Sequence, residues 1–408
     1  MKTNKHTKVR HNIIANILRP PVHLFFKLFF GLNLTKYKLD KNQPYLILSN
    51  HIGGYDPIFI SLSFNQPIYY VASDHLFRLS FISKILKFCF APIPISKTMI
   101  DIKSIRHIKS VASENGCIGL FPSGNGSFNG EEAYISPAIG KLVKLLNIPV
   151  ILYNLQGLYF CTPRWAAHHS KGCFNGKIVR QIEVEEIKNY SSEQLSDIII
   201  TNLKTSAYET QKANMQPYKG RNPAMYLERA LYTCPHCHSR NTMQSKNDIF
   251  YCTKCNYSVK YNTFGFFESE NKNSVCFDSI IMWDNWQKEL LLKEYKNDIL
   301  FNKDTPLYTD EKIKLFSCFY MKKNVLLHTG VLKLFYDRIE IVSDTKSSIF
   351  YLADILEIQA ILGQILQFST QDGSFYEIKS DFVYSALKYV HIINLIKNGE
   401  GQSGLFSV

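Results

Sequence analysis

The strongest chemical signal in the chain is a histidine and an aspartate five residues apart on a glycine-containing turn. The run reads Ser49-Asn50-His51-Ile52-Gly53-Gly54-Tyr55-Asp56-Pro57. A histidine can take a proton from a hydroxyl near neutral pH, and a carboxylate across the turn can accept its other ring N–H, which fixes the tautomer. The pattern predicts a general base, His51, with Asp56 as its partner. Taken alone, it fits equally a helix-capping Asp56 beside an incidental histidine.

A second signal is a pair of Cys-x-x-Cys motifs with 14 residues between them. Their members are Cys234, Cys237, Cys252 and Cys255. Four thiolates at this spacing suit one tetrahedral, structural Zn²⁺, as in zinc ribbons. The other six cysteines are scattered, which is typical of a reducing compartment rather than a disulfide framework. The open alternatives are a ligand exchange with His236 or His238, haem attachment, and thiols without metal.

The elements that must position His51 follow from hydrophobic patterning. Residues 44–185 alternate strand-like and helix-like segments, which predicts an α/β fold with a mixed sheet layered by helices. The expected strands are Tyr45–Ser49, Ile68–Ser73, Cys117–Phe121, Pro149–Gly157 and Gly176–Val184, and the expected helices are 57–64, 79–90, 101–115, 137–147 and 192–215. His51 would then follow the first strand, on a strand-to-helix turn of the kind that often carries catalytic groups.

The part of the chain after residue 215 has a different character. Residues 216–231 are linker-like, and a Cys-rich module follows from 232 to about 268. The tail has a helical run at 283–295 and closes with a helix at about 381–397. Between them lie short β-rich runs at 315–320, 331–336, 338–342, 348–352, 364–369 and 374–378. This order resembles a pleckstrin-homology-like barrel in architecture, so we expect an α+β C-terminal domain.

The N-terminal segment is basic and amphipathic. Residues 1–42 contain nine Lys or Arg and one acid, Asp40, in a chain of net charge +13. Such a pattern is attracted to anionic lipid surfaces and to nucleic acid. The apolar run Pro20–Thr35 contains Lys27 and is shorter than the about 20 residues that span a bilayer. We therefore expect residues 12–34 to form one or two short interfacial helices, with no transmembrane segment and no signal peptide.

Four blocks of the chain, in order, resemble the motifs of the glycerolipid acyltransferase family, which includes the 1-acylglycerol-3-phosphate acyltransferases. Asn50-His51 with Asp56 resembles the first motif, Asn-His-x4-Asp. Phe121-Pro-Ser-Gly-Asn-Gly-Ser127 resembles the block Phe-Pro-Glu-Gly-Thr-Arg-Ser. Pro92–Lys97 occupies the place of the second block, with Lys97 where the family usually carries Arg, and Ile148-Pro149-Val150 resembles the last block. The resemblance covers about residues 20–215.

The third block departs from the family pattern. The resemblance assigns its Glu and Arg to binding the acceptor's phosphate and glycerol, and here Ser123 and Gly126 stand in those places. Residues 121–140 contain no Lys or Arg, so Lys97, Lys141 and Arg164 are the candidates to replace the missing base. The substrate-binding residues that the resemblance implies are Asn50, Lys97, Ser123, Gly124, Asn125, Gly126 and Ser127.

The resemblance implies acyl transfer from a thioester on coenzyme A or acyl carrier protein to the free hydroxyl of a lysophospholipid such as 1-acylglycerol-3-phosphate. The implied partners are these substrates and an anionic membrane surface, at the cytoplasmic face, in a peripheral or monotopic mode. The expected domains are an interface segment 1–42, an acyltransferase domain 43–220, a zinc ribbon 232–268 and a β-rich domain 281–408. A non-catalytic lipid-surface relative is the alternative. A nucleic-acid binder is not expected, because the basic excess lies beside Phe and Leu in residues 1–42 rather than on the ribbon.

Overall fold

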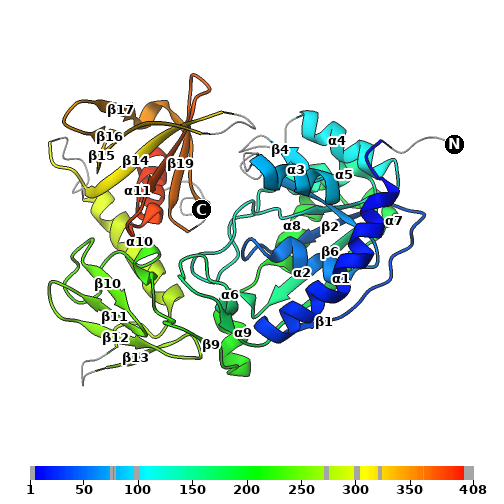
Figure 1. Ribbon diagram of the computed structural model, residues 1–408, viewed down its shortest axis with the longest axis horizontal. Coiled ribbons are helices and arrows are strands. Elements are labelled where there is room, and N and C mark those ends of the chain that lie inside the picture. The colour runs from blue at the N-terminus through cyan, green and yellow to red at the C-terminus, as the bar shows by residue number, and fades with distance from the viewer. Residues whose placement is uncertain are drawn as a thin grey trace. The chain divides into compact units, whose positions relative to one another are not determined.

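The computed structural model describes residues 5–73, 77, 80–95, 102–270, 275–297, 304–319, 324–361 and 363–398 (Figure 1). The chain divides into two units. The first consists of residues 1–127, 131–161 and 171–216, and the second of residues 128–130, 162–170 and 217–408.

The first unit is built on a seven-stranded sheet with the order β1-β8-β6-β2-β5-β3-β4. The strands are β1 (Leu32–Leu34), β2 (Tyr45–Ser49), β3 (Ile68–Ser73), β4 (Ile93–Ile95), β5 (Cys117–Leu120), β6 (Val150–Gln156) and β8 (Phe174–Ile182). Neighbouring strands are parallel except β6 and β8, which are antiparallel. The sheet is therefore mixed, as the sequence predicts.

Helices cover both faces of this sheet. Leu46 and Leu48 of β2 join a buried cluster that includes Val143 of α5 and Ile199 of α8. Because side chains alternate along a strand, Ile47 and Ser49 face the opposite side of the sheet. The helices are α1 (Val9–Phe30), α2 (Asp56–Ser63), α3 (Ser80–Cys89), α4 (Ile102–Ala112), α5 (Ala138–Leu146), α6 (Leu158–Cys161), α7 (Val184–Asn189), α8 (Ser192–Leu203) and α9 (Ala207–Asn214). This arrangement confirms the α/β class.

Two helical expectations differ from the structure. The region 192–215 forms two helices, because the chain leaves the helix at Lys204 and Ser206 caps α9 by accepting a hydrogen bond from Glu209 N. The N-terminal segment forms one continuous helix of 22 residues, α1, with Pro20 and Pro21 inside it. The expectation of one or two short helices at 12–34 was therefore wrong about length.

The second unit contains a small four-stranded antiparallel sheet at its start. Its strands are β10 (Met243–Lys246), β11 (Ile249–Cys252), β12 (Ser258–Tyr261) and β13 (Phe267–Ser269). Two-residue strands β7 (Ser170–Lys171) and β9 (Lys219–Gly220) and the 3₁₀ turn η2 (Leu227–Arg229) precede it. Helix α10 (Ile280–Lys296) follows, and the Trp283 ring lies against Phe250 of β11 and Phe267 of β13.

The rest of the second unit is a seven-stranded antiparallel sheet of order β17-β16-β15-β14-β20-β19-β18, followed by helix α11 (Ala386–Asn398). Its strands are β14 (Tyr308–Cys318), β15 (Val325–Leu334), β16 (Arg338–Val342), β17 (Ser347–Tyr351), β18 (Ile355–Ile361), β19 (Ile365–Thr370) and β20 (Phe375–Ser380), with the 3₁₀ turn η4 (Leu352–Asp354) before β18. Four consecutive strands, three further strands and a closing helix agree with the expected α+β domain. Strand β18 was not expected from the sequence.

Candidate active site and candidate metal centre

The histidine turn is held at the end of the central strand β2. Asn50 is fully buried, and its side-chain amide exchanges two hydrogen bonds with the main chain of Leu155 on β6, at 2.8 and 2.9 Å. A third hydrogen bond, of 3.2 Å, runs from Asn50 Nδ2 to Thr205 Oγ1. Asn50 thus fixes the strand end from which the turn starts. Its amide is engaged inside the protein rather than presented to solvent.

His51 and Asp56 are in direct contact. His51 Nδ1 lies 2.6 Å from Asp56 Oδ2, and the same oxygen accepts the main-chain N–H groups of Ile52, at 2.6 Å, and Gly53, at 3.0 Å. Asp56 is the first residue of α2 and its side chain is fully buried, whereas 19% of the His51 side chain is exposed. With Nδ1 bound to the carboxylate, the other ring nitrogen, Nε2, is the one that a substrate can use.

Aromatic rings fix the plane of the imidazole. The His51 ring stacks on Phe121, with centroids 4.4 Å apart and an interplanar angle of 22°. Phe121 in turn lies 6.0 Å from Tyr70 of β3, nearly parallel to it. Phe121 directly follows β5, so the third sequence block lies beside the histidine turn.

The loop 121–127 is joined to His51 through its main chain. Ser127 N donates to His51 O at 3.2 Å, and Gly124 N closes a turn onto Phe121 O at 3.0 Å. Gly124 has φ +72°, a left-handed conformation that favours glycine, although an added Cβ would meet no atom within 4 Å. Ser123 and Asn125 are partly exposed and Gly124 is exposed, whereas Gly126 and Ser127 are buried.

The structure adds one residue that the sequence motifs do not include, Glu132. Its two carboxylate oxygens lie 3.3 and 3.2 Å from the main-chain nitrogen of His51, and the Ser123 hydroxyl also hydrogen-bonds to it. Burial raises the pKa of Glu132 to about 8, and the nearby charge of Asp56 raises it further. Hydrogen bonds from Ser123 and from the His51 main chain lower the pKa but do not outweigh burial. The only available sequence signal was weak, since Glu131 and Glu132 are the only charged residues between Phe121 and Gly140.

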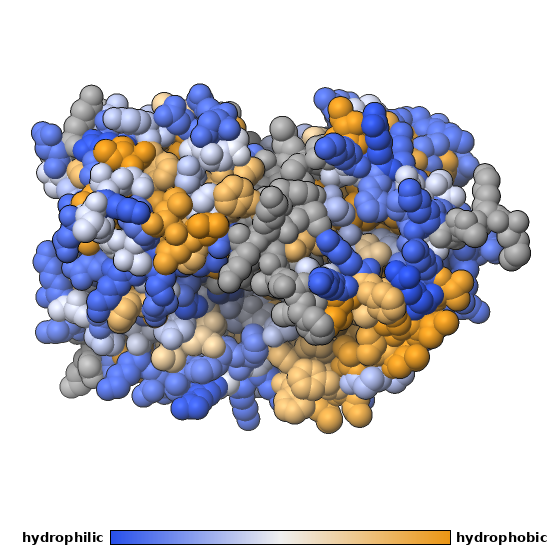
Figure 2. Space-filling model, turned by 45° about the horizontal axis from the view of Figure 1, so that its top comes forward, coloured by the Kyte–Doolittle hydropathy of each residue, from blue (hydrophilic) through white to orange (hydrophobic). Residues whose placement is uncertain are grey.

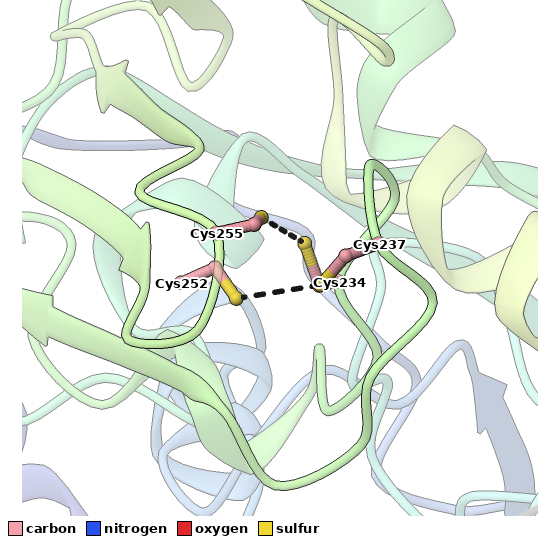
Figure 3. A group of neighbouring side chains, drawn as sticks. All are labelled: Cys234, Cys237, Cys252 and Cys255. Carbon is pink, nitrogen blue, oxygen red and sulfur yellow. Dashed lines mark hydrogen bonds between the residues drawn. The ribbon is translucent and has the colours of Figure 1, made fainter.

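In the second unit, the four cysteines of the two Cys-x-x-Cys motifs gather in one place (Figure 3). Their sulfur atoms all lie within 4.8 Å of one another, with 3.6 Å between Cys234 and Cys255 and 3.8 Å between Cys237 and Cys252. Zinc–thiolate bonds of about 2.3 Å in a tetrahedron place sulfurs about 3.8 Å apart. The arrangement therefore fits a tetrahedral Cys₄ zinc site.

The two cysteine turns have the same main-chain geometry. His238 N donates to Cys234 O at 3.0 Å and Asn256 N donates to Cys252 O at 3.2 Å, and His238 and Asn256 both have positive φ, 56° and 59°. Burial raises the pKa of Cys237, but hydrogen bonds with Ser239, Cys255 and Cys234 outweigh it and lower the pKa to about 6. Burial raises the pKa of Cys234 and of Cys255 in the same cluster. His238 belongs to the turn, and its ring lies 5.4 Å from that of Trp286.

The comparison with protein families bears on the first unit. Residues 33–153 match the family described as Acyltransferase, a span that includes His51, Asp56 and the loop 121–127. This part of the chain is therefore similar to an acyltransferase domain. Among solved structures, the 1-acyl-sn-glycerophosphate (LPA) acyltransferase PlsC from Thermotoga maritima is similar at 13% identity and a TM-score of 0.38, over 50% of this chain and 78% of that chain. At these values the likeness says nothing about the substrate. No curated protein matches the chain.

Two of the three candidate bases lie among the described residues, and both are engaged by other groups. Lys141 is exposed on α5, where its charge acts on Glu193 of α8. Arg164 belongs to the second unit, donates to Ala360 O at 2.7 Å and lies over the Phe128 ring, and burial lowers its pKa to about 10. Lys97 lies outside the described residues.

Helix α1 packs against the rest of the first unit beside the histidine turn. The Phe26 ring lies 4.8 Å from Phe59 of α2 and 5.8 Å from Tyr55, the residue before Asp56. Within the described residues, α1 is the one helix long and apolar enough to cross a membrane, by length and composition only. Its outward side is apolar, with these side chains exposed: Val9, Ile13, Ile17, Leu18, Leu24, Phe25, Leu28 and Phe29. Figure 2 shows a large apolar patch at lower right, in the part of the picture where α1 lies.

Proposed function

We propose that the chain transfers a fatty acyl group from a thioester, on coenzyme A or acyl carrier protein, to the free hydroxyl of a lysophospholipid. The observation that carries this proposal is the His51–Asp56 pair, in which a buried carboxylate holds Nδ1 at 2.6 Å inside the segment that matches the Acyltransferase family. Ser123, Gly124, Asn125, Gly126 and Ser127 form the neighbouring loop and are proposed to contact the acceptor.

In the proposed reaction, His51 Nε2 takes the proton of the acceptor hydroxyl as its oxygen attacks the thioester carbonyl. The tetrahedral intermediate then collapses, the C–S bond breaks, and the imidazolium returns a proton to the leaving thiolate. Asp56 holds the ring in the tautomer that leaves Nε2 unprotonated and stabilises the imidazolium that forms.

The position of α1 supports a lipid acceptor. Helix α1 contacts the rest of the first unit near its start, middle and end. His11 Nδ1 lies 3.1 Å from Tyr69 OH, and Arg19 donates to Gln66 O at 2.6 Å. Phe26 packs on Phe59. A helix attached along its length cannot also cross a bilayer, so we infer that α1 lies in the membrane interface with its apolar side toward the lipid. The acceptor would then reach the neighbouring catalytic turn from the membrane surface.

The acceptor preference is a finer part of the proposal. Residues 121–140 supply no Lys or Arg, the charge of Lys141 acts on Glu193, and the Arg164 guanidinium donates to Ala360 O. A phosphate monoester has up to two charges and gains most from a bidentate guanidinium. We therefore propose that this enzyme discriminates less in favour of lysophosphatidic acid than relatives with the complete third block.

The Cys₄ cluster is proposed to hold a structural Zn²⁺. Four thiolates would fill the coordination shell, so the ion would have no open position for catalysis. Its contribution would be to stabilise the small sheet β10–β13 against α10, where Trp283 Nε1 donates to Thr233 O at 2.9 Å, next to Cys234.

The test is an acyl-transfer assay with acyl-CoA and acyl-acyl carrier protein against lysophospholipids that carry a phosphate monoester or a phosphodiester. His51→Ala should lower kcat by about 10²–10⁴-fold. His168→Ala is the matched control, because His168 is exposed and belongs to the second unit. Activity of His51→Ala within a few-fold of the parent would refute the mechanism. Vesicle binding without acylation of any acceptor would favour the alternative, a non-catalytic lipid-surface protein.

A further inference from the structure

Glu132 makes three separate attachments inside the first unit. Its carboxylate accepts the main-chain N–H of His51, with both oxygens within 3.3 Å of that nitrogen, and it interacts with the Ser123 hydroxyl, which also lies 3.4 Å from Asn125 O. Its own main-chain N–H donates to Thr205 O at 3.1 Å. The side chain therefore joins the histidine turn to the loop 121–127, and its main chain is fixed independently of both.

His51 is consequently held at three points. Asp56 holds the ring through Nδ1, Ser127 N binds the main-chain carbonyl, and Glu132 binds the main-chain N–H. Asp56 determines the tautomer and ring direction, whereas Glu132 and Ser127 determine where the main chain of His51 lies relative to the loop. General base catalysis depends on such placement, because misplacement by about 1 Å can cost about a hundredfold in rate.

We propose that Glu132 is a positioning residue for acyl transfer, which locks the main chain of His51 to Ser123 and so sets where the imidazole meets the acceptor hydroxyl. The expected effect on kcat/KM rests on the proposed function, whereas the placement of the His51 turn by Glu132 does not depend on it. It assigns a role to a residue outside the four sequence blocks.

The ionisation of Glu132 should appear in the pH dependence of activity. Among the described residues, the charged group that acts on its carboxylate is Asp56, and His51 contacts it through the main-chain N–H. While protonated, the carboxyl group can accept from His51 N–H with one oxygen and donate to Ser123 with the other. Once ionised, it places a second negative charge near the fully buried Asp56, and repulsion between the two carboxylates disturbs the placement of the His51 turn. Activity should therefore fall as Glu132 ionises.

The test compares Glu132→Gln with Glu132→Ala. The glutamine keeps an acceptor for His51 N–H and a donor for Ser123 but cannot ionise, so kcat/KM near pH 7 should stay within about threefold of the parent and the alkaline loss of activity should disappear. The alanine removes both contacts and should lower kcat/KM by about ten- to a hundredfold. Glu131→Gln is the control, because Glu131 is the exposed neighbour.

Two results would overturn the proposal: Glu132→Ala within about twofold of the parent, or Glu132→Gln with the parent's pH profile. A second measurement does not require activity. In ¹⁵N-histidine-labelled protein, identified by comparison with His51→Ala, the His51 ring resonances should move in Glu132→Ala and stay in place in Glu132→Gln and Glu131→Gln. If the parent acylates nothing but these shifts occur, the proposed function fails and the positioning role stands; unchanged shifts in Glu132→Ala reject the positioning role.

Discussion

Replacing Asp56 by asparagine is the most informative single perturbation of the catalytic turn. Asp56 Oδ2 accepts three hydrogen bonds, from His51 Nδ1 and from the main-chain N–H groups of Ile52 and Gly53. An asparagine has nearly the same shape, and its carbonyl oxygen can still accept the two main-chain bonds. The turn should therefore keep its conformation while the contact with His51 changes.

The size of the loss in kcat depends on which atom of the asparagine side chain faces His51 Nδ1. If its NH₂ group takes the place of Oδ2, it forces the tautomer in which Nε2 carries the proton and the general base is lost, and the N–H groups of Ile52 and Gly53 also lose their acceptor. If its oxygen faces Nδ1, the tautomer is right but the negative charge that stabilises the imidazolium is absent. The corresponding substitution in serine proteases lowers kcat by about 10⁴-fold. We expect about 10³–10⁴-fold here, with little change in KM or in melting temperature.

Asp56→Ala provides the contrast, because it also leaves the main-chain N–H groups of Ile52 and Gly53 without their acceptor. An unsatisfied buried donor costs about 1–3 kcal/mol, so this variant should lose stability as well as activity. Thiol release from the acyl donor gives the rate, and thermal unfolding gives the stability. Asp197→Asn, an exposed position on α8, is the control for the substitution itself. Activity of Asp56→Asn within about tenfold of the parent would mean that Asp56 is only a helix cap.

Three further predictions concern the metal, the membrane and pH. The protein should contain one zinc per chain, and Cys252→Ser should lose it and lower the unfolding midpoint seen by tryptophan fluorescence, since the three tryptophans lie in the second unit, whereas Cys173→Ser should not. Zinc-free parent protein purified under reducing conditions would contradict this. Replacing the exposed Leu24 and Leu28 of α1 by glutamine should weaken binding to anionic vesicles about tenfold or more without changing the melting temperature. Glutamine at the exposed Leu145 of α5 is the control and should change neither vesicle binding nor the melting temperature. Equal binding by all variants would place the membrane contact elsewhere. Because the pKa of Glu132 is raised to about 8 in the folded protein, the native state holds a proton that the unfolded chain has lost, so stability should fall as pH rises from about 4.5 to about 8, and Glu132→Gln should remove part of that fall. The same pH dependence in both proteins would contradict it.

Local patterns in the sequence were sufficient for the features that depend on neighbouring residues. The run Tyr45–Ser49 is apolar and bounded by turn residues, and it is the fully buried central strand β2. The Cys-x-x-Cys spacing predicts a four-sulfur cluster because each turn brings two sulfurs together through its own main chain, and the structure has that cluster. The five-residue spacing of His51 and Asp56 likewise closes a contact within one turn.

Features that depend on distant parts of the chain were decided only by the tertiary structure. Helix α1 contains Pro20 and Pro21, although proline lacks the N–H that a helix interior uses. The helix continues, and contacts on both sides of the prolines hold it on the domain, through Arg19 and through Phe26. Strand β18 was missed for a similar reason, since it is defined by its pairing with β19 and carries no distinctive turn signal before it.

The sequence by itself determined the fold class, the contact between His51 and Asp56, and the cluster of four cysteines, because these follow from hydrophobic period and from short spacings that the main chain closes locally. It could not distinguish Glu131 from Glu132, which are adjacent and chemically identical. The fold exposes the first and turns the second toward His51 and Ser123, residues 81 and 9 positions away in the chain. That choice depends on how β2, β5 and the segment after the loop pack together, which no local pattern encodes.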